Sequence, residues 1–166
     1  MNPVTVYIDA ANIILSAKRL EFNLELDNLL QYLKDKYRGV RILFFIGDVA
    51  YLSEIRNVLL KHSIELIIKQ TSKEGNKLKA NCDVELTNKM TIDVERNKVD
   101  EILLLSGDGD FVALTDYVKN MGKDIRCIAV SPMDTSNLIK QRPYLRIMYL
   151  IQIKEKLEIK KPSLST

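Results

Sequence analysis

The sequence has few of the residues on which most catalytic and metal-binding sites depend. Its 166 residues include one histidine, two cysteines and no tryptophan. The two cysteines lie far apart and form no CxxC spacing, which excludes the common Cys/His zinc sites and argues against a disulfide scaffold. A single histidine also removes most histidine-dependent catalysis, including serine triads and histidine-paired cysteine nucleophiles. An active site in this chain must therefore be built from carboxylates, hydroxyls or lysines.

Long hydrophobic runs and phosphate-binding motifs are also absent. No apolar run approaches the roughly 20 residues that are needed to cross a bilayer. The N-terminus lacks the basic and apolar regions of a signal peptide, so we expect a cytoplasmic protein with no membrane partner. Neither GxGxxG nor GxxxxGK[ST] occurs, which argues against nucleotide binding through those loops.

The composition and length are those of one globular domain, with 46% hydrophobic and 28% charged residues. The net charge of +3 is uneven. From Lys140 onward there are seven Lys/Arg and two Glu, which leaves 18 basic and 20 acidic residues before it. We therefore expect a single domain over residues 1–153 and a basic, flexible tail over residues 154–166.

Strand and helix signals alternate along the chain. Short apolar, β-branched runs predict strands at residues 4–8, 40–46, 64–68, 102–105 and 125–130. Apolar stripes at helical spacing begin at Leu26, Leu52, Asp83 and Phe111. Because most strand runs are apolar on both faces, the pattern predicts an α/β fold, a three-layer α/β/α sandwich with a mainly parallel sheet. The segment 145–153 is compatible with either a late strand or a helix.

Acidic residues follow two of the predicted strands and begin one predicted helix. Asp9 follows the first strand directly, and Asp108 and Asp110 follow the fourth. Asp83 begins the third helix on the stripe that faces the sheet. Because ligands of an open parallel sheet gather at the carboxyl ends of its strands, we expect these four side chains to share one site.

Carboxylates that lie close together repel one another unless a cation neutralises them. Mg²⁺ or Mn²⁺ prefers such oxygen ligands and can align a water for attack on a phosphodiester. Asn12 could orient a ligand or bond a phosphate oxygen without adding charge. Simpler roles exist for single residues, since Asp83 and Asp110 suit helix N-caps and Asp108 suits a turn.

Three segments together resemble the NYN domain, a branch of the PIN-like nucleases. They are residues 6–12, 79–86 and 106–111, in the family's order, and the resemblance spans roughly residues 4–140. It implies a PIN-like sheet and a metal-dependent endoribonuclease with a Mg²⁺ or Mn²⁺ site. The implied metal ligands and catalytic acids are Asp9, Asp83, Asp108 and Asp110.

The same resemblance implies roles for three further residues and shows one departure. Asn12 would belong to the catalytic site, and Lys79 or Ser106 would assist phosphate binding. Where many members carry another acid or a histidine in the helix, this chain has Lys89. Asp93, one turn further on, is a candidate to compensate.

Basic residues indicate single-stranded RNA as the partner. Lys73, Lys77 and Lys79 lie in a polar segment, and Arg142 lies near Tyr144 and Tyr149. Cations can bind phosphates while tyrosines stack on bases. The alternative is a solvated segment with both tyrosines in the core. The sequence leaves the oligomeric state open, a homodimer included.

Two other functions compete with a nuclease. The first is a catalytically inactive PIN-like module that binds nucleic acid or protein, which Lys89 favours. The second is a phosphate-transfer enzyme of the haloacid dehalogenase type, which also begins with an aspartate after a strand. That chemistry needs a second aspartate two residues after Asp9, where this chain has Ala11.

Overall fold

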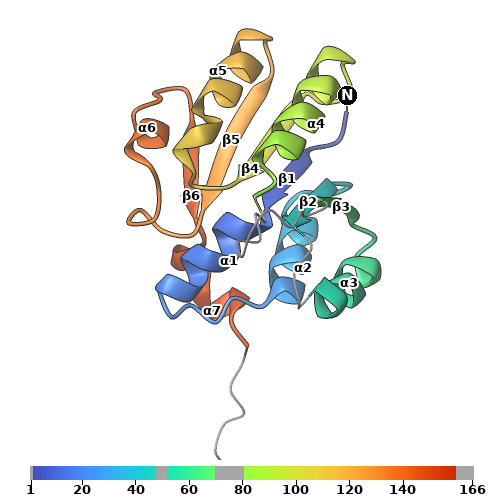
Figure 1. Ribbon diagram of the computed structural model, residues 1–166, viewed down its shortest axis with the longest axis vertical. Helices are drawn as coiled ribbons and strands as arrows, with labels where there is room; N and C mark the ends of the chain where they lie inside the picture. The colour runs from blue at the N-terminus through green and yellow to red at the C-terminus, as the bar shows by residue number, and fades with distance from the viewer. Residues whose placement is uncertain (1, 48–51, 70–80, 160–166) are drawn as a thin grey trace, which may run out of the picture.

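The computed structural model describes residues 2–47, 52–69 and 81–159. Strands and helices alternate through most of this range, as predicted (Figure 1). The elements follow in the order β1 (Thr5–Asp9), α1 (Ala10–Arg19), α2 (Leu26–Lys36), β2 (Arg41–Gly47), α3 (Leu52–Lys61), β3 (Glu65–Lys69), α4 (Asp83–Glu95), β4 (Glu101–Leu105), η1 (Gly109–Phe111), α5 (Val112–Asn120), β5 (Asp124–Ala129), α6 (Asn137–Lys140), β6 (Arg146–Tyr149), η2 (Leu150–Ile153) and α7 (Lys154–Leu157).

The strands form one six-stranded sheet in the order β3-β2-β1-β4-β5-β6. Every neighbouring pair is parallel. Each of the five predicted strands is confirmed to within one residue at either end. The undecided segment 145–153 contains β6, which pairs with β5 at the edge of the sheet, followed by the 3-10 turn η2.

Helices cover both faces of the sheet and create two hydrophobic cores. Val6 and Ile8 pack in one core with residues of α1 and α2. Tyr7 points to the opposite face and packs with residues of α4 and α5. Figure 1 shows these two pairs of helices on opposite sides of the strands. The predicted three-layer α/β/α sandwich is thus confirmed, and the two buried faces explain why the strand sequences are apolar throughout.

Helix α1 is an element that the sequence patterns did not predict. Its N-cap is Asp9, whose side chain accepts a hydrogen bond from the backbone N–H of Asn12 at 3.2 Å. Ile13 and Ala17 lie four residues apart and are buried against the sheet. The signal was therefore present but short, because only about one turn separates these two positions. Within the described residues, no helix has the length and apolar character that crossing a membrane requires.

The predicted start of the tail at residue 154 is wrong. Lys154–Leu157 forms the short helix α7, which packs on α2. Leu157 is fully buried, which stabilises the fold by roughly 1.5–3 kcal/mol, and its carbonyl accepts a hydrogen bond from Glu25 at 2.9 Å. The domain thus continues beyond residue 153 because one apolar side chain in this charged segment fits the core. Residues 160–166 lie outside the described residues.

Candidate functional site

The carboxyl ends of β1 and β4 lie side by side at the centre of the sheet. Strand order reverses between them, since β2 and β3 extend on one side and β5 and β6 on the other. A parallel sheet leaves a crevice at such a switch point, outside the carboxyl ends of its strands. Asp9 ends β1, and the segment that follows β4 begins at Ser106. The sequence-predicted acids therefore meet at the place where a parallel sheet binds ligands.

Asp9 is buried at the base of this crevice, with 5% of its surface exposed. Its Oδ1 accepts from the backbone N–H of Asn12, and its Oδ2 accepts from the Ser106 hydroxyl at 2.9 Å. Burial raises the pKa of Asp9 to about 6, against the lowering effect of the bonds from Asn12 and Ser106. The nearby charges of Asp83 and Asp108 contribute to this increase in pKa.

Three other aspartates form a cluster above Asp9. One carboxylate oxygen from each of Asp83, Asp108 and Asp110 lies within 4.8 Å of the other two. Burial raises the pKa of Asp83, a hydrogen bond from Asn81 opposes this, and the charges of Asp108 and Asp110 add to the increase. The three carboxylates thus repel one another, which is the condition that a bound cation relieves.

The cluster has nearly the dimensions of a Mg²⁺ site. Mg²⁺ holds oxygen ligands at 2.0–2.1 Å, so two ligands on opposite sides of the ion are about 4 Å apart. The three carboxylate oxygens all lie within 4.8 Å of one another, which is close to that span. Asp9 is not a member of this set, although it lines the same pocket. Its assignment as a direct metal ligand stays a prediction.

Local hydrogen bonds orient the carboxylates of Asp83 and Asp108. Asn81 Nδ2 donates to Asp83 Oδ2 at 2.7 Å, while the Asp83 backbone N–H donates to Asn81 Oδ1 at 2.8 Å. Asp108 accepts from the backbone N–H of Asp110 at 3.0 Å and caps η1. The helix-capping aspartates are therefore Asp9 and Asp108, whereas Asp83 and Asp110 do not serve as N-caps.

Asn12 connects α1 to the segment after β4. Its Oδ1 accepts a hydrogen bond from the backbone N–H of Gly107 at 2.9 Å. Ser106, predicted to assist phosphate binding, is fully buried, bonds Asp9 and accepts from the Asp108 backbone N–H at 3.2 Å. It therefore positions the acids and does not contact a substrate.

Gly107 is required by close packing. A Cβ at this position would lie 2.9 Å from the backbone oxygen of Asp134, so a side chain here would displace the segment after β5. Gly107 thus lets the segments after β4 and β5 pack together, which holds Asp108 beside the crevice.

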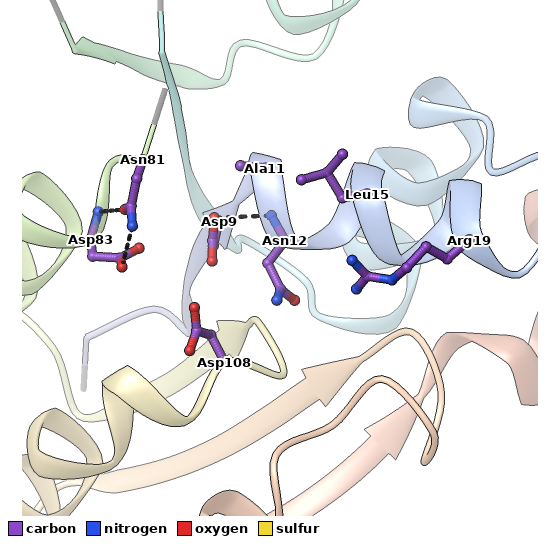
Figure 2. Close-up of a pocket in the computed structure, with 8 residues that line it drawn as sticks. All are labelled: Asp9, Ala11, Asn12, Leu15, Arg19, Asn81, Asp83 and Asp108. Carbon is purple, nitrogen blue, oxygen red and sulfur yellow. Dashed lines mark hydrogen bonds between the residues drawn. The ribbon is translucent and has the colours of Figure 1, made fainter. Parts of the chain in front are cut away.

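A pocket of about 320 Å³ opens between the acids and α1 (Figure 2). Its lining residues are Asp9, Ala11, Asn12, Leu15, Arg19, Asn81, Asp83 and Asp108. Arg19 is a site residue that sequence reasoning missed. Asn12, Leu15 and Arg19 follow a helical i, i+3, i+7 spacing, which would have indicated a shared face if α1 had been predicted.

Arg142, a predicted substrate-binding residue, is engaged elsewhere. Its Nε donates to Asp116 on α5 at 2.9 Å, and it does not line the pocket. Tyr144 bonds the same carboxylate and Thr115 and is partly buried against the core. Arg142 and Tyr144 thus contact Asp116 on α5, away from the pocket, and the role of Arg142 in substrate binding stays a prediction. The other predicted substrate-binding residues, Lys73, Lys77 and Lys79, lie outside the described residues.

Lys89 and Asp93 belong to a separate polar network. The Lys89 ammonium donates to Asp93 at 3.2 Å. Asp93 is fully buried and also accepts from the Tyr7 hydroxyl at 2.9 Å and from Arg41 at 3.0 Å. Asp93 lies ten residues after Asp83 along α4, about 15 Å further on. Asp93 therefore does not compensate for a missing acid, and Lys89 does not line the pocket.

Comparisons with known proteins agree with this fold. The family model described as NYN domain matches residues 3–148. A crystal structure of a protein of unknown function from Vibrio parahaemolyticus is similar with a TM-score of 0.71 and 19% sequence identity, over 87% of this chain and 91% of that one. At this identity the likeness shows the fold, which is PIN-like. A search of curated proteins gives no significant match.

Proposed function

Since the chain belongs to the NYN domain family of PIN-like nucleases, we propose that it is a metal-dependent endoribonuclease acting on single-stranded RNA. The observation that carries this proposal is the convergence of Asp83, Asp108 and Asp110 within 4.8 Å at the switch point of the sheet. These residues come from two segments 25 positions apart, and their mutual repulsion is costly without a cation. An arrangement of this kind is typical of a site whose function depends on that cation.

The donor set fits Mg²⁺ or Mn²⁺. Asp83, Asp108 and Asp110 would hold the ion. Asp9, which lines the same pocket, would either act as a fourth ligand or add negative charge close to the ion. Both oxygens of Asp9 accept one hydrogen bond each, which leaves each a lone pair directed elsewhere. When bound, the ion stabilises negative charge on the phosphoryl oxygens and supplies a means to activate water.

The surrounding residues fix the acids in place before substrate arrives. Ser106 and the N-terminus of α1 hold both oxygens of Asp9, and Asn81 holds Asp83. Asn12 ties the segment carrying Asp108 to the same helix. Such pre-organisation places the ligands without reorganisation during the reaction, which is how electrostatic catalysis lowers a barrier.

RNA is proposed as the substrate on the basis of the family and of the lysines in the segment next to the site. Lys69 donates to the backbone oxygen of Asn81 at 2.7 Å, which ties the end of β3 to the start of α4. In the sequence, Lys73, Lys77 and Lys79 fall between these two positions, and Asn81 lines the pocket. Lysines there would bind phosphates of a strand that enters the crevice.

The rival function, an inactive binding module, loses the feature that favoured it. Lys89 was that feature, and its ammonium pairs with Asp93. The pocket is lined by Asp9, Asp83 and Asp108, which remain together as a nuclease requires. We therefore propose a single function for this site.

The decisive experiment is incubation of labelled single-stranded RNA with the purified protein, with and without millimolar Mn²⁺. We expect Mn²⁺-dependent internal cleavage by the wild type and its loss in Asp108→Asn. Asp35→Asn is the matched control, because Asp35 is exposed on α2 and bonds Gln31. Equal cleavage by wild type and Asp108→Asn would identify a contaminating nuclease and remove the proposal.

A further inference from the structure

Arg19 is a basic side chain in a pocket whose other charged lining residues are acids. It ends α1 and lines the same cavity as Asp9, Asp83 and Asp108. Figure 2 shows its guanidinium extending from the last turn of the helix toward Asn12 and the carboxylates. The cavity is therefore negative at one end and positive at the other.

The guanidinium is held in position but retains capacity to bind. Its Nε donates to Asp134 Oδ1 at 2.9 Å, and its Nη2 donates to the Ser16 hydroxyl at 3.0 Å. These bonds use two of its five N–H donors among the described residues. Its side chain is 59% exposed, whereas that of Asp134 is 13% exposed. The pair therefore neutralises a largely buried carboxylate while most of the arginine side chain remains open to the pocket.

Leu15 lies between the two charged ends of the pocket. Its side chain is 53% exposed although it is large and apolar. It lies one turn before Arg19 on the same helical face. The sugar and base of a nucleotide present apolar surface between two phosphates, which matches an apolar side chain between a cation-binding cluster and an arginine.

The dimensions agree with one nucleotide unit. The cavity of about 320 Å³ is at the lower end of the range for small-molecule sites, which begins at about 300 Å³. The helix rises about 10 Å between Asn12 and Arg19, and the arginine side chain extends back toward Asn12 over part of this distance. One phosphate at the acids and the next at the guanidinium would span the pocket.

We propose that Arg19, with Leu15 beside it, forms a subsite for the phosphate of the nucleotide adjacent to the scissile bond. This inference rests on the proposed nuclease function. A guanidinium binds phosphate through two parallel hydrogen bonds, which a lysine cannot reproduce. Asp134 holds the guanidinium when substrate is absent and competes with phosphate for it. The enzyme therefore binds a substrate with two consecutive phosphates more tightly than a single phosphodiester.

The test compares two substrates in Mn²⁺: a short labelled RNA, and bis(p-nitrophenyl) phosphate, which has one phosphodiester and no neighbouring phosphate. We expect Arg19→Ala to raise KM for RNA about tenfold, as loss of a charge-assisted bond predicts, and to leave kcat/KM for the small diester unchanged. Arg19→Lys should give an intermediate KM. Lys18→Ala is the matched control, because Lys18 is exposed on the same helix and does not line the pocket.

Two further readouts separate a phosphate subsite from a structural ion pair. Arg19→Ala should lower the slope of log KM against log salt concentration by about 0.7, the value for one contact on a single strand. Asp134→Asn removes the competing carboxylate and should lower KM for RNA. If Arg19 only stabilises the fold, Arg19→Ala and Asp134→Asn will shift both substrates in the same direction, and the proposal is overturned.

Failure of the nuclease function gives a different result. If the wild type cleaves neither substrate, the subsite is tested by fluorescence anisotropy of the labelled RNA in Ca²⁺. An affinity about tenfold lower for Arg19→Ala than for Lys18→Ala then supports the subsite without catalysis. Equal affinities of these two variants, or no binding by the wild type, would overturn it.

Discussion

The side-chain oxygen of Asn12 accepts a hydrogen bond from the backbone N–H of Gly107 at 2.9 Å, across 95 positions of the sequence. This bond joins the helix that Asp9 caps to the segment that carries Asp108. The distance between those two acids therefore depends on a neutral residue. We regard Asn12 as a positioning residue of the site.

Replacing Asn12 with alanine should loosen this connection. The Gly107 N–H would lose its partner, so we expect the free energy of unfolding to fall by about 1–2 kcal/mol and kcat on RNA to fall more than KM rises. Asn12→Asp keeps an acceptor oxygen and should recover stability when Mn²⁺ is present. Denaturant unfolding together with steady-state kinetics checks both effects. Unchanged stability in Asn12→Ala would mean that the bond does not hold the segment.

Asp9 should destabilise the metal-free protein at neutral pH. Folded Asp9 takes up its proton at about pH 6, whereas its ordinary pKa is 3.8. Between these values the folded state binds more protons than the unfolded state, so the free energy of unfolding falls as pH rises from about 4 to 6. Asp9→Asn should remove this fall and stabilise the metal-free protein by roughly 1–2 kcal/mol at pH 7. Thermal unfolding in EDTA at pH 4 and pH 7 measures the difference, and a less stable variant at pH 7 contradicts the prediction.

Metal binding should strengthen as pH rises through the same range. Ligand carboxylates bind metal in their ionised form, and the pKa values of Asp9 and Asp83 are both raised. We expect the Kd for Mn²⁺ to be about tenfold higher at pH 5 than at pH 7, because protonated carboxylates bind the ion more weakly. Calorimetric titration at both pH values measures this, and Asp9→Asn should reduce the difference. A Kd that does not change with pH would show that no raised carboxylate takes part.

Lys89→Ala should have little effect on activity. The Lys89 ammonium pairs with Asp93, which keeps its bonds to Tyr7 and Arg41 when the lysine is removed. We expect the Mn²⁺ affinity and kcat to remain those of the wild type, with a loss of at most about 1 kcal/mol in unfolding free energy. A several-fold gain in metal affinity would instead place the Lys89 charge close to the acids.

Lys73→Ala combined with Lys77→Ala should weaken RNA binding and flatten its dependence on salt. Each lost phosphate contact lowers the log–log slope by about 0.7 on a single strand. Lys18→Ala with Lys119→Ala is the control, since it removes the same charge from exposed positions on α1 and α5. Binding curves at several salt concentrations provide the slopes. Equal slopes for the two double variants would reject the lysine segment as part of the RNA site.

The sequence predicted the central strands β1, β2, β4 and β5 accurately because they lie buried between two layers of helices. Val6 and Ile8 face one core and Tyr7 faces the other. An apolar run without alternation therefore indicates a strand that is buried on both faces. The edge strand β6 has a weaker signal than the edge strand β3. The residues of β6 are only partly buried, and a run with polar members fits a strand or a helix equally well.

The acids could be predicted for a similar reason. Asp9 and Asp108 follow strands that the sequence showed clearly, and parallel strands bring their carboxyl ends to one edge. The alternatives for Asp83 and Asp110 as helix caps were reasonable, yet Asp9 and Asp108 are the capping residues. Local sequence does not distinguish these roles, because any aspartate near a helix start offers the same acceptor.

The sequence by itself determined the alternation of strands and helices, the two-sided burial of the sheet and the identity of the acids. These properties follow from local periodicity and from the geometry of parallel strands. Only the tertiary structure decided which polar side chains reach the pocket. Arg19 enters it while Arg142 pairs with Asp116, and Ser106 is buried beneath Asp9. The direction of such side chains is set by contacts between segments far apart along the chain, and no pattern of neighbouring residues records those contacts.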